Sequence, residues 1–358
     1  MEEEFILAIN PGSTSTKIAV FKNTREVFLK NIKHSREELA HFDSITDQYE
    51  FRRDIVLKEL ENASINVKSI SVIVGRGGLV KPIPSGVYEV NEALINDLKV
   101  GVLGQHASNL GGLIANNIAK TIPNAKAYIA DPVVVDELDD IARISGHPHF
   151  ERISIFHALN QKAIARQHAK SVTRKYEDLN LIVAHLGGGI SVGAHCKGRV
   201  IDVNQALDGE GPFSPERSGT LPAGALVDLC YSGQYTREEV RRMITGNGGY
   251  AAYLGTNDAY EVEKRGQAGD ETARLLHDAM AYQVAKEIGA MGTVLKGEVD
   301  AILLTGGIAY GKPFVDYIIG RVSHVGPVYV YPGEDEMRSL AMNGLMVTKG
   351  ETEPREYK

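Results

Sequence analysis

Short apolar runs alternate along the chain with longer segments in which apolar residues recur every three or four positions. The short runs are typical of buried strands, and they cover residues 5–10, 71–74, 127–130, 181–185 and 300–304. The longer segments predict helices over residues 36–62, 92–98, 110–121, 160–176, 237–243 and 271–295. Strands that alternate with helices in this way indicate an α/β protein.

The longest predicted helix, over residues 271–295, has the clearest pattern. Its apolar side chains recur at a spacing that places them on one face of a helix, and they are Ala273, Leu276, Met280, Val284, Ile288, Met291 and Leu295. This face is therefore expected to pack against a hydrophobic core.

A strand–turn–strand pattern occurs twice in the chain. Residues 6–20 place a turn of Gly, Ser and Thr between two apolar runs, and residues 181–194 repeat this order with three consecutive glycines. Two copies about half a chain length apart predict two related domains that face each other. A third small-residue turn, Gly306-Gly307, follows another predicted buried strand.

Length and composition fit a two-domain globular protein. The chain has 358 residues, of which 43% are hydrophobic and 24% charged, so wholesale disorder is excluded. The 39 basic and 46 acidic side chains give a formal net charge of −7. Since no basic excess is present to neutralise phosphate chains, neither a nucleic acid nor a membrane surface is an expected partner.

The cellular setting is predicted from the cysteines and from the apolar runs. Cys196 and Cys230 are too few for a disulfide framework or a cysteine zinc site. The start, Met1-Glu2-Glu3-Glu4, is acidic where a signal peptide is basic, and no apolar run approaches the length of a membrane span. A soluble cytoplasmic protein is therefore expected.

Turns of Gly, Ser and Thr after a strand present backbone N–H groups and hydroxyls, which suit phosphate oxygens. A plain hairpin turn is the alternative for any one of them, and three in one chain favour a phosphate site. The P-loop signature and the protein-kinase motifs are absent. Residues 187–193 lack the dinucleotide-binding spacing and lead into a strand, which argues against a Rossmann site.

Several charged and titratable residues stand next to predicted strands or in Gly-rich loops. Arg76 and Arg217 have small, flexible neighbours, and a guanidinium suits phosphate or carboxylate, although a surface arginine or an ion pair is the alternative for each. The histidines near strands are either packed core residues or catalysts, and their spacing does not favour zinc. Asp131 is a candidate carboxylate for Mg²⁺ or for a polar site, and the alternative is a turn residue before proline. Glu336 is a candidate site residue at the start of a predicted helix, and the alternative is an acid that only complements the helix dipole.

Five strings occur in a characteristic order along nearly the whole chain, namely Asn10-Pro11-Gly12-Ser13-Thr14-Ser15-Thr16-Lys17, Gly75-Arg76-Gly77-Gly78, His185-Leu186-Gly187-Gly188-Gly189, Glu216-Arg217-Ser218-Gly219 and Thr305-Gly306-Gly307-Ile308. Together they resemble the acetokinase family, whose members phosphorylate short carboxylic acids. The resemblance implies the duplicated actin-like (ribonuclease H-like) α/β fold, with two βββαβαβα domains and an inter-domain cleft. The expected domains are residues 1–152 with 338–358 on the acyl side, and residues 153–337 on the nucleotide side.

The resemblance also implies roles for individual residues. The catalytic residues are expected to be Asn10, Arg76, Asp131, His157 and Arg217. ATP is expected to contact Ser13, Thr14, Ser15, Thr16, Lys17, His185, Gly187, Gly188, Gly189, Asp258, Gly306, Gly307 and Ile308. The acid is expected to contact Arg76, His106 and Asn109, and Mg²⁺ to be held by Asn10, Asp131 and Glu336.

The chain departs from the acetate kinases of this family in two places. Gly188 stands where they carry an asparagine, and Asn257-Asp258-Ala259-Tyr260 stands where they carry Asp-Phe-Arg. The chain is also shorter, which favours a branch that phosphorylates butyrate.

The expected reaction is reversible, direct transfer of a phosphoryl group from ATP to the carboxylate of butyrate or a similar short or branched acid. A homo-oligomer is expected by family analogy. An acetate or propionate kinase of the same family is one alternative, and an actin- or Hsp70-like nucleotide switch is another.

Overall fold

The computed structural model describes residues 3–358, so that Met1 and Glu2 of the acidic start lie outside it. Two compact units make up the chain. The first comprises the residues up to Val135 together with Asp335–Lys358, and the second is Asp136–Glu334. The domain limits predicted from the sequence, 152/153 and 337/338, stay a prediction.

The first unit is built on a six-stranded sheet in the order β3-β2-β1-β4-β6-β5. Its strands are β1 (Phe5–Pro11), β2 (Ser15–Lys22), β3 (Arg25–Lys33), β4 (Ile70–Arg76), β5 (Val87–Glu89) and β6 (Lys126–Ala130). Its helices are α1 (Arg36–Leu39), α2 (Tyr49–Asn62), α3 (Glu92–Val100), α4 (Asn109–Ala119) and α13 (Glu336–Thr348), with 3-10 turns η1 (Thr46–Gln48) and η2 (Val67–Ser69). Strands β1, β4 and β6 run parallel, while β2 and β3 extend the sheet in antiparallel fashion.

The second unit repeats this plan with the order β11-β10-β7-β8-β9. Its strands are β7 (Asn180–Leu186), β8 (Ile190–Cys196), β9 (Arg199–Val203), β10 (Ala301–Gly306) and β11 (Val328–Pro332). Its helices are α5 (Asp140–Arg143), α6 (Ala158–Ser171), α7 (Ala223–Tyr231), α8 (Arg237–Ile244), α9 (Gly249–Leu254), α10 (Ala259–Gln267), α11 (Glu271–Val294) and α12 (Lys312–Val322), with η3 (Tyr176–Asp178) and η4 (Gly307–Tyr310). The predicted duplication is confirmed, because β1–β2 and β7–β8 are equivalent hairpins in equivalent sheets.

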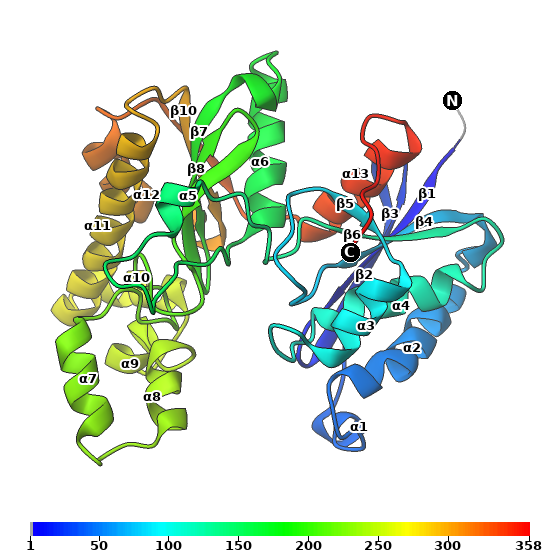
Figure 1. The fold of residues 1–358 in the computed structure, drawn as a ribbon, viewed down its shortest axis with the longest axis horizontal. Helices are drawn as coiled ribbons and strands as arrows, with labels where there is room; N and C mark the ends of the chain where they lie inside the picture. The colour runs from blue at the N-terminus through cyan, green and yellow to red at the C-terminus, as the bar shows by residue number, and fades with distance from the viewer. Residues whose placement is uncertain (1–2) are drawn as a thin grey trace. The chain divides into compact units, whose positions relative to one another are not determined.

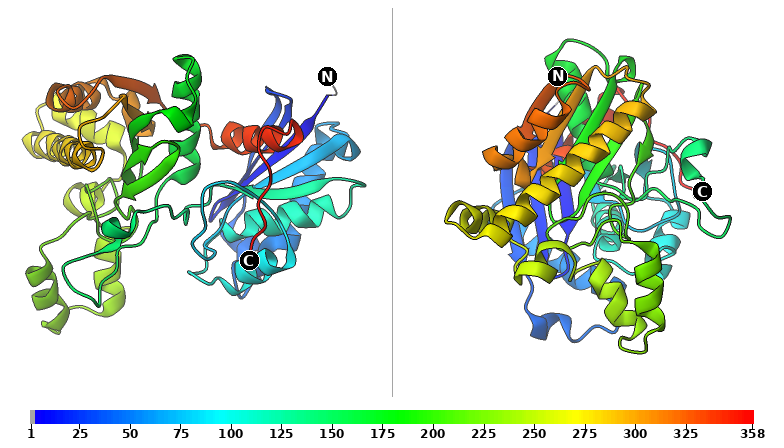
Figure 2. Two further views of the ribbon diagram at one scale, coloured as in Figure 1. Left: turned by 45° about the horizontal axis from the view of Figure 1, so that its top comes forward. Right: turned by 90° about the vertical axis from the view of Figure 1, so that its left-hand side faces the viewer.

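Both sheets are covered by helices on both faces, so their central strands are apolar on both sides. In the second unit, Ile182 and Ala184 pack toward α11, while the alternate residues Leu181 and Val183 pack in the cluster that includes α6. Figure 1 shows α6 and α11 on opposite faces of this sheet, and Figure 2 shows α11 from a second direction. Six of the seven apolar residues predicted for the face of α11 are buried, and Leu276 is partly buried against the same core.

In the first unit, α2 and α4 share the core with β1 and β4, and α13 contacts the same two strands. Figure 1 shows α13 on the other face of the sheet. The close packing of α4 requires glycine, because a Cβ on Gly111 would lie 2.2 Å from the carbonyl oxygen of Arg76. Helix α4 therefore lies directly behind the carboxyl end of β4.

Two predicted helices differ from the structure. Residues 36–62 do not form one helix, because Ser44 and Asp47 bond to each other's backbone N–H groups and begin a new helical segment. The helix predicted over residues 160–176 ends at Ser171, and Thr173 beyond it has a positive φ of 56°.

Candidate functional site

Three predicted site residues stand at the carboxyl ends of neighbouring parallel strands in the first unit. Asn10 lies near the end of β1, Arg76 ends β4, and Asp131 directly follows β6. The register pairs Ile9 with Gly75, and Arg76 with Ala130. The carboxyl edge of an open α/β sheet is where ligands commonly bind.

Glu336, at the first turn of α13, joins two of these residues. The amide of Asn10 donates to its carboxylate, and Arg76 forms an ion pair with it at 3.3 Å. The Nη1 atom of Arg76 also donates to Oδ1 of Asn10 at 3.3 Å. Arg76 and Glu336 remain 29% and 23% exposed, so both side chains are accessible to a ligand.

Asp131 is buried and is held by a neighbouring loop. Its Oδ1 accepts from the hydroxyl of Ser85 at 2.6 Å and from the backbone N–H of Gly86 at 2.9 Å. Its φ of 38° is in the left-handed region, where non-glycine residues are uncommon and often mark functional sites. The orientation of this carboxylate is therefore set by the loop that precedes β5.

The first small-residue turn, residues 12–16, is held from its interior side by Arg52 of α2. This guanidinium is 1% exposed and donates to the carbonyls of Gly12, Ser13 and Ser15 at 2.7, 3.0 and 3.0 Å. It also bonds to Gln48, one helical turn earlier. Burial lowers the pKa of Arg52 to about 10, so the group stays charged at neutral pH.

The side chains of this turn divide into outward and inward groups. Ser13, Thr14 and Lys17 are exposed and Ser15 is half-buried, whereas the hydroxyl of Thr16 is buried and bonds to His34 at 2.8 Å and to Arg52 at 3.2 Å. Thr16 thus helps to hold the turn. Burial and the Arg52 charge lower the pKa of His34 to about 4, so His34 is neutral beside that cation.

The two residues predicted near the acyl group precede or begin α4. His106 is exposed, and its Nδ1 lies 2.8 Å from the hydroxyl of Ser108. Asn109 is fully buried, and its amide bonds to the backbone of Leu79, Leu98 and Gly104. The observed bonds of Asn109 therefore shape the loop after Arg76, and its contact with the acid stays a prediction.

Two predicted histidines of the second unit stack on each other. His157 precedes α6 and His185 lies on β7, and their ring centroids are 3.8 Å apart with planes inclined by 12°. His157 Nδ1 lies 2.8 Å from the Ser191 hydroxyl, and His185 Nδ1 lies 2.8 Å from Oδ1 of Asn160. The other ring nitrogen of His185 faces Glu334 at 3.4 Å.

The glycine turn after β7 accommodates the side chain of Arg217. A Cβ on Gly189 would lie 1.8 Å from Nη1 of Arg217, and this nitrogen donates to the carbonyl of Ala206 at 2.8 Å. Burial lowers the pKa of Arg217, and the neighbouring Glu216 opposes this shift. Among residues 3–358, the buried Nε of Arg217 has no hydrogen-bond partner, so this partly buried side chain has a donor that an anion could use.

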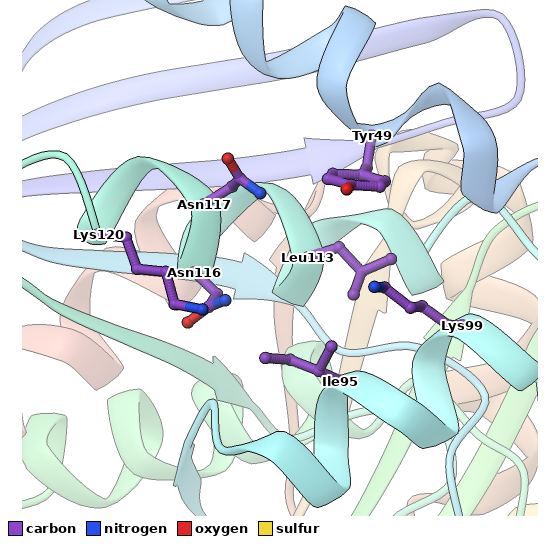
Figure 3. Close-up of a pocket in the computed structure, with 7 residues that line it drawn as sticks. All are labelled: Tyr49, Ile95, Lys99, Leu113, Asn116, Asn117 and Lys120. Atoms are coloured by element: carbon purple, nitrogen blue, oxygen red, sulfur yellow. The ribbon is translucent and has the colours of Figure 1, made fainter.

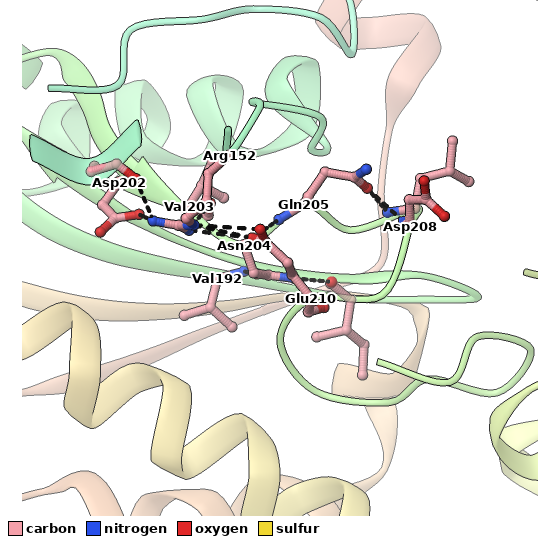
Figure 4. Close-up of polar contacts among 11 residues, drawn as sticks. Arg152, Val192, Asp202, Val203, Asn204, Gln205, Asp208 and Glu210 are labelled. Carbon is pink, nitrogen blue, oxygen red and sulfur yellow. Dashed lines mark hydrogen bonds and ion pairs between the residues drawn. The ribbon is translucent and has the colours of Figure 1, made fainter. Parts of the chain in front are cut away.

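The segment that carries Ala206 is held by a polar network around Arg152 (Figure 4). Arg152 donates to Asp202 at 3.0 Å and to Glu210 at 3.3 Å. Glu210 also accepts from the backbone N–H of Gln205 at 3.0 Å. This network fixes the loop on which the carbonyl partner of Arg217 lies.

The remaining predicted nucleotide contacts lie at the ends of other elements. Gly306 ends β10 next to β7, with a φ of 92°, and Gly307 and Ile308 begin η4. Asp258 is exposed and caps α10, where it accepts from the N–H groups of Tyr260 and Glu261. The structure thus brings the β7 and β10 turns side by side, while the contacts of Asp258 are those of a helix cap.

A separate cavity of about 210 Å³ lies in the first unit between α2, α3 and α4. Its lining combines two lysines with polar and apolar side chains (Figure 3), and consists of Tyr49, Ile95, Lys99, Leu113, Asn116, Asn117 and Lys120. None of the predicted site residues lines it, so it is distinct from the carboxyl edge of the sheet.

The donor set at that edge fits Mg²⁺ but not a closed protein cage. Within residues 3–358 no group of three His, Cys, Asp or Glu side chains is arranged to hold a metal ion. Mg²⁺ commonly uses one or two carboxylates and fills its other positions with phosphate oxygens and water. The amide oxygen of Asn10 and the carboxylate of Glu336, with Asp131 directly after β6, are of this kind.

The chemistry of both units suits anions. Arg76, Arg217 and two histidines supply charge and hydrogen-bond donors, and the first turn adds exposed hydroxyls. Such groups bind phosphate and carboxylate and compensate charge in phosphoryl transfer. In the described part of the chain, no helix is long and apolar enough to cross a membrane.

Sequence comparison relates the chain to kinases of short carboxylic acids. The Acetokinase family matches residues 148–325. Butyrate kinase 2 and butyrate kinase 1 of Clostridium acetobutylicum are each 57% identical to this chain over 353 residues, which cover 99% of both proteins.

Solved structures confirm the predicted actin-like fold. Acetate kinase of Porphyromonas gingivalis has a TM-score of 0.78 at 17% identity, covering 96% of this chain and 100% of that one. A propionate kinase from Francisella tularensis has a TM-score of 0.75 at 19% identity, covering 95% and 98%. At such identities the likeness shows the fold, whereas the 57% identity over the full length carries the assignment. This chain belongs to the acetokinase family.

Proposed function

We propose that this protein is a butyrate kinase, which transfers the γ-phosphoryl group of ATP reversibly to the carboxylate of butyrate, giving butyryl phosphate and ADP. The observation that carries the proposal is the 57% identity to two butyrate kinases over 99% of the chain. It is an ATP-dependent carboxylate kinase with a cytoplasmic location. It works as a homo-oligomer, and analytical ultracentrifugation would measure the number of subunits.

The acceptor needs no general base. A short carboxylic acid in water has a pKa of about 4, so it is already ionised at neutral pH. The difficulty is to bring this anion toward an anionic phosphate, and charge compensation and positioning solve it. Arg76 has this role toward the carboxylate, with its guanidinium oriented by Asn10 and Glu336, and His106 and Asn109 complete the acyl side.

The phosphoryl group is assigned to residues of the second unit. Arg217 brings a partly buried cation with a free Nε donor, and His157 brings a ring held by Ser191 and stacked on His185. In a low-dielectric site such donors stabilise developing charge more than they do in water. The β7 turn, the Gly306 turn and Asp258 form the nucleotide side.

In the first unit, the first turn and the carboxyl edge of the sheet are assigned to the phosphates. The hydroxyls of residues 13–15 and Lys17 position phosphate oxygens, with Thr16 holding the turn from within. Asn10, Asp131 and Glu336 would hold Mg²⁺. When bound, this ion neutralises charge on the phosphate oxygens.

The test is a substrate series. ADP release would be followed with ATP and Mg²⁺ across formate, acetate, propionate, butyrate, isobutyrate and valerate, while hydroxylamine traps the acyl phosphate. The highest kcat/KM is expected at four carbons, with overlap among neighbours because one methylene changes kcat/KM by only about 10–200-fold. A maximum at acetate would assign a different substrate, and binding of ATP without acid-dependent turnover would refute the kinase.

Arg76→Ala probes the site itself. We expect turnover to fall by at least about 100-fold with melting unchanged, because the side chain is partly exposed. Arg53→Ala is the matched control, since Arg53 is an arginine of α2 that pairs with Asp54. Near-normal turnover of folded Arg76→Ala would remove this residue from the site.

A further inference from the structure

A continuous row of buried polar groups leads from η3 to the ring of His157. Its links are Tyr176 hydroxyl to His195 Nδ1 at 2.7 Å, His195 Nε2 to Gln161 Oε1 at 2.9 Å, Gln161 Nε2 to Ser191 Oγ at 2.8 Å, and Ser191 Oγ to His157 Nδ1 at 2.8 Å. Gln161, Ser191 and His195 are all 0% exposed. Proton positions along such a row are assigned from the donors and acceptors that each group can offer.

The side-chain amide of Gln161 has a single consistent orientation. Its Nε2 also lies 3.0 Å from the backbone carbonyl of Ser191. A carbonyl oxygen can only accept, so the NH₂ group must lie at this end and Oε1 must face His195. Exchanging the two atoms would place two acceptor oxygens against each other in the interior, where they repel.

The orientation of Gln161 determines the proton on His195. Because Oε1 only accepts, Nε2 of His195 carries the hydrogen. Complete burial, together with the charges of Lys162 and Arg166, holds the pKa of His195 well below its usual value, so the ring is neutral and its Nδ1 accepts from Tyr176. Each group in the row therefore donates a hydrogen bond to the next, from Tyr176 toward His157.

The hydroxyl of Ser191 accepts from Gln161 and donates to His157, so the direction of donation continues. Its oxygen accepts from Nε2 of Gln161 at 2.8 Å and lies 3.4 Å from the backbone N–H of His157, which also donates to it. A hydroxyl has two acceptor positions and one hydrogen. With both positions in use, the hydrogen points to Nδ1 of His157, at 2.8 Å.

We propose that Gln161 and Ser191 are positioning residues that hold His157 as the neutral tautomer with its proton on Nε2, so that the ring can only donate to the phosphoryl group. This inference rests on the proposed function and deepens the role of His157 within it. A neutral donor with a fixed orientation needs no reorganisation as charge develops. Neutrality also suits the 3.8 Å stack on His185, where two imidazolium rings would repel each other.

The direct test is ¹⁵N NMR of imidazole-labelled protein without ligand, which distinguishes protonated from unprotonated ring nitrogens. His157→Gln identifies the signals of His157 among the 11 histidines. The expected result is an unprotonated Nδ1 and a protonated Nε2. Gln161→Glu should reverse this pattern or make the ring cationic, because a carboxylate cannot donate to Ser191 and takes its hydroxyl hydrogen instead.

Kinetics provide the second readout. Ser191→Ala should lower kcat at least tenfold while KM for butyrate changes less than threefold, and Ser191→Thr should retain the wild-type tautomer because it keeps the hydroxyl. His168→Gln is the matched control, since His168 is another buried histidine of α6, bonded to Tyr331. Its turnover should stay within twofold of wild type.

The outcomes separate this inference from the proposed function. A neutral His157 with its proton on Nδ1, or a folded Ser191→Ala variant with wild-type tautomer and kcat, would overturn the inference even if the enzyme phosphorylates butyrate. An Nε2-protonated ring in a protein that phosphorylates no acid would confirm the tautomer and refute the function.

Discussion

Replacing Arg52 by methionine tests whether one buried guanidinium holds the first turn. Methionine keeps most of the length and apolar contact of the side chain but removes every donor. The carbonyls of Gly12, Ser13 and Ser15 then lose the partners that lie within 3.0 Å. Gln48 loses the same donor, and so does Thr16, which keeps its bond to His34.

The expected loss of stability is about 3 kcal/mol. Each acceptor left without its charged donor costs about 1–3 kcal/mol, and relief from burying a cation without a carboxylate partner offsets part of the sum. In a unit of this size, 1 kcal/mol corresponds to about 2–4 °C. The melting temperature should therefore fall by about 6–12 °C.

Calorimetry and steady-state kinetics would check this prediction. The exposed hydroxyls of the turn should lose their positions, so kcat/KM for ATP should drop by about tenfold or more, a change of about 1.4 kcal/mol. Arg53→Met is the control, because its partly exposed pair with Asp54 and its one hydrogen bond to Asn117 should together contribute less than about 2 kcal/mol. Arg52→Met with unchanged melting and unchanged kcat/KM for ATP would refute the reasoning.

Two further predictions concern the second turn and pH. Gly189→Ala should lower turnover by about tenfold or more with the fold retained, because its Cβ would displace the guanidinium of Arg217. Gly224→Ala, on the exposed surface of α7 with nothing within 4 Å of its Cβ, should be nearly neutral, and equal activities of the two variants would contradict this. The depressed pKa of His34, about 4, makes the unfolded chain bind a proton that the folded protein does not between about pH 6.5 and 4. The contribution of neutral His34 to the free energy of unfolding should therefore be fully present above about pH 6.5 and fall with decreasing pH, by about 1–2 kcal/mol at pH 5. In thermal melts, His34→Gln should remove this part of the pH dependence of stability.

Local pattern predicted the elements well where they are long or fully buried. The strands β1, β4, β6, β7 and β10 and the apolar face of α11 follow from periodicity, because burial on both faces of a sheet or one face of a helix leaves a regular signal. The break after α1 was missed, because Ser44 and Asp47 act through side-chain bonds to the backbone that periodicity does not register.

The site residues also divide into those that the sequence indicates and those that it does not. Arg76 and Asp131 could be singled out because each ends or follows a recognisable strand, and Asn10 because it opens the first string shared with the family. The parallel register then places them at one edge. Arg52 gave no such signal. It is one of several charged residues on α2, and its burial depends on the side of the helix that faces the first turn.

By itself, then, the sequence determined the α/β class, the duplicated hairpin and the family, since these depend on local periodicity and on ordered strings of residues. The tertiary structure alone decided which polar groups meet. The bonds of Arg52 to the first turn, of Glu336 to Asn10, and of Gln161 to Ser191 join residues distant in the chain. Such contacts leave no periodic trace, because each depends on the packing of a helix against a sheet.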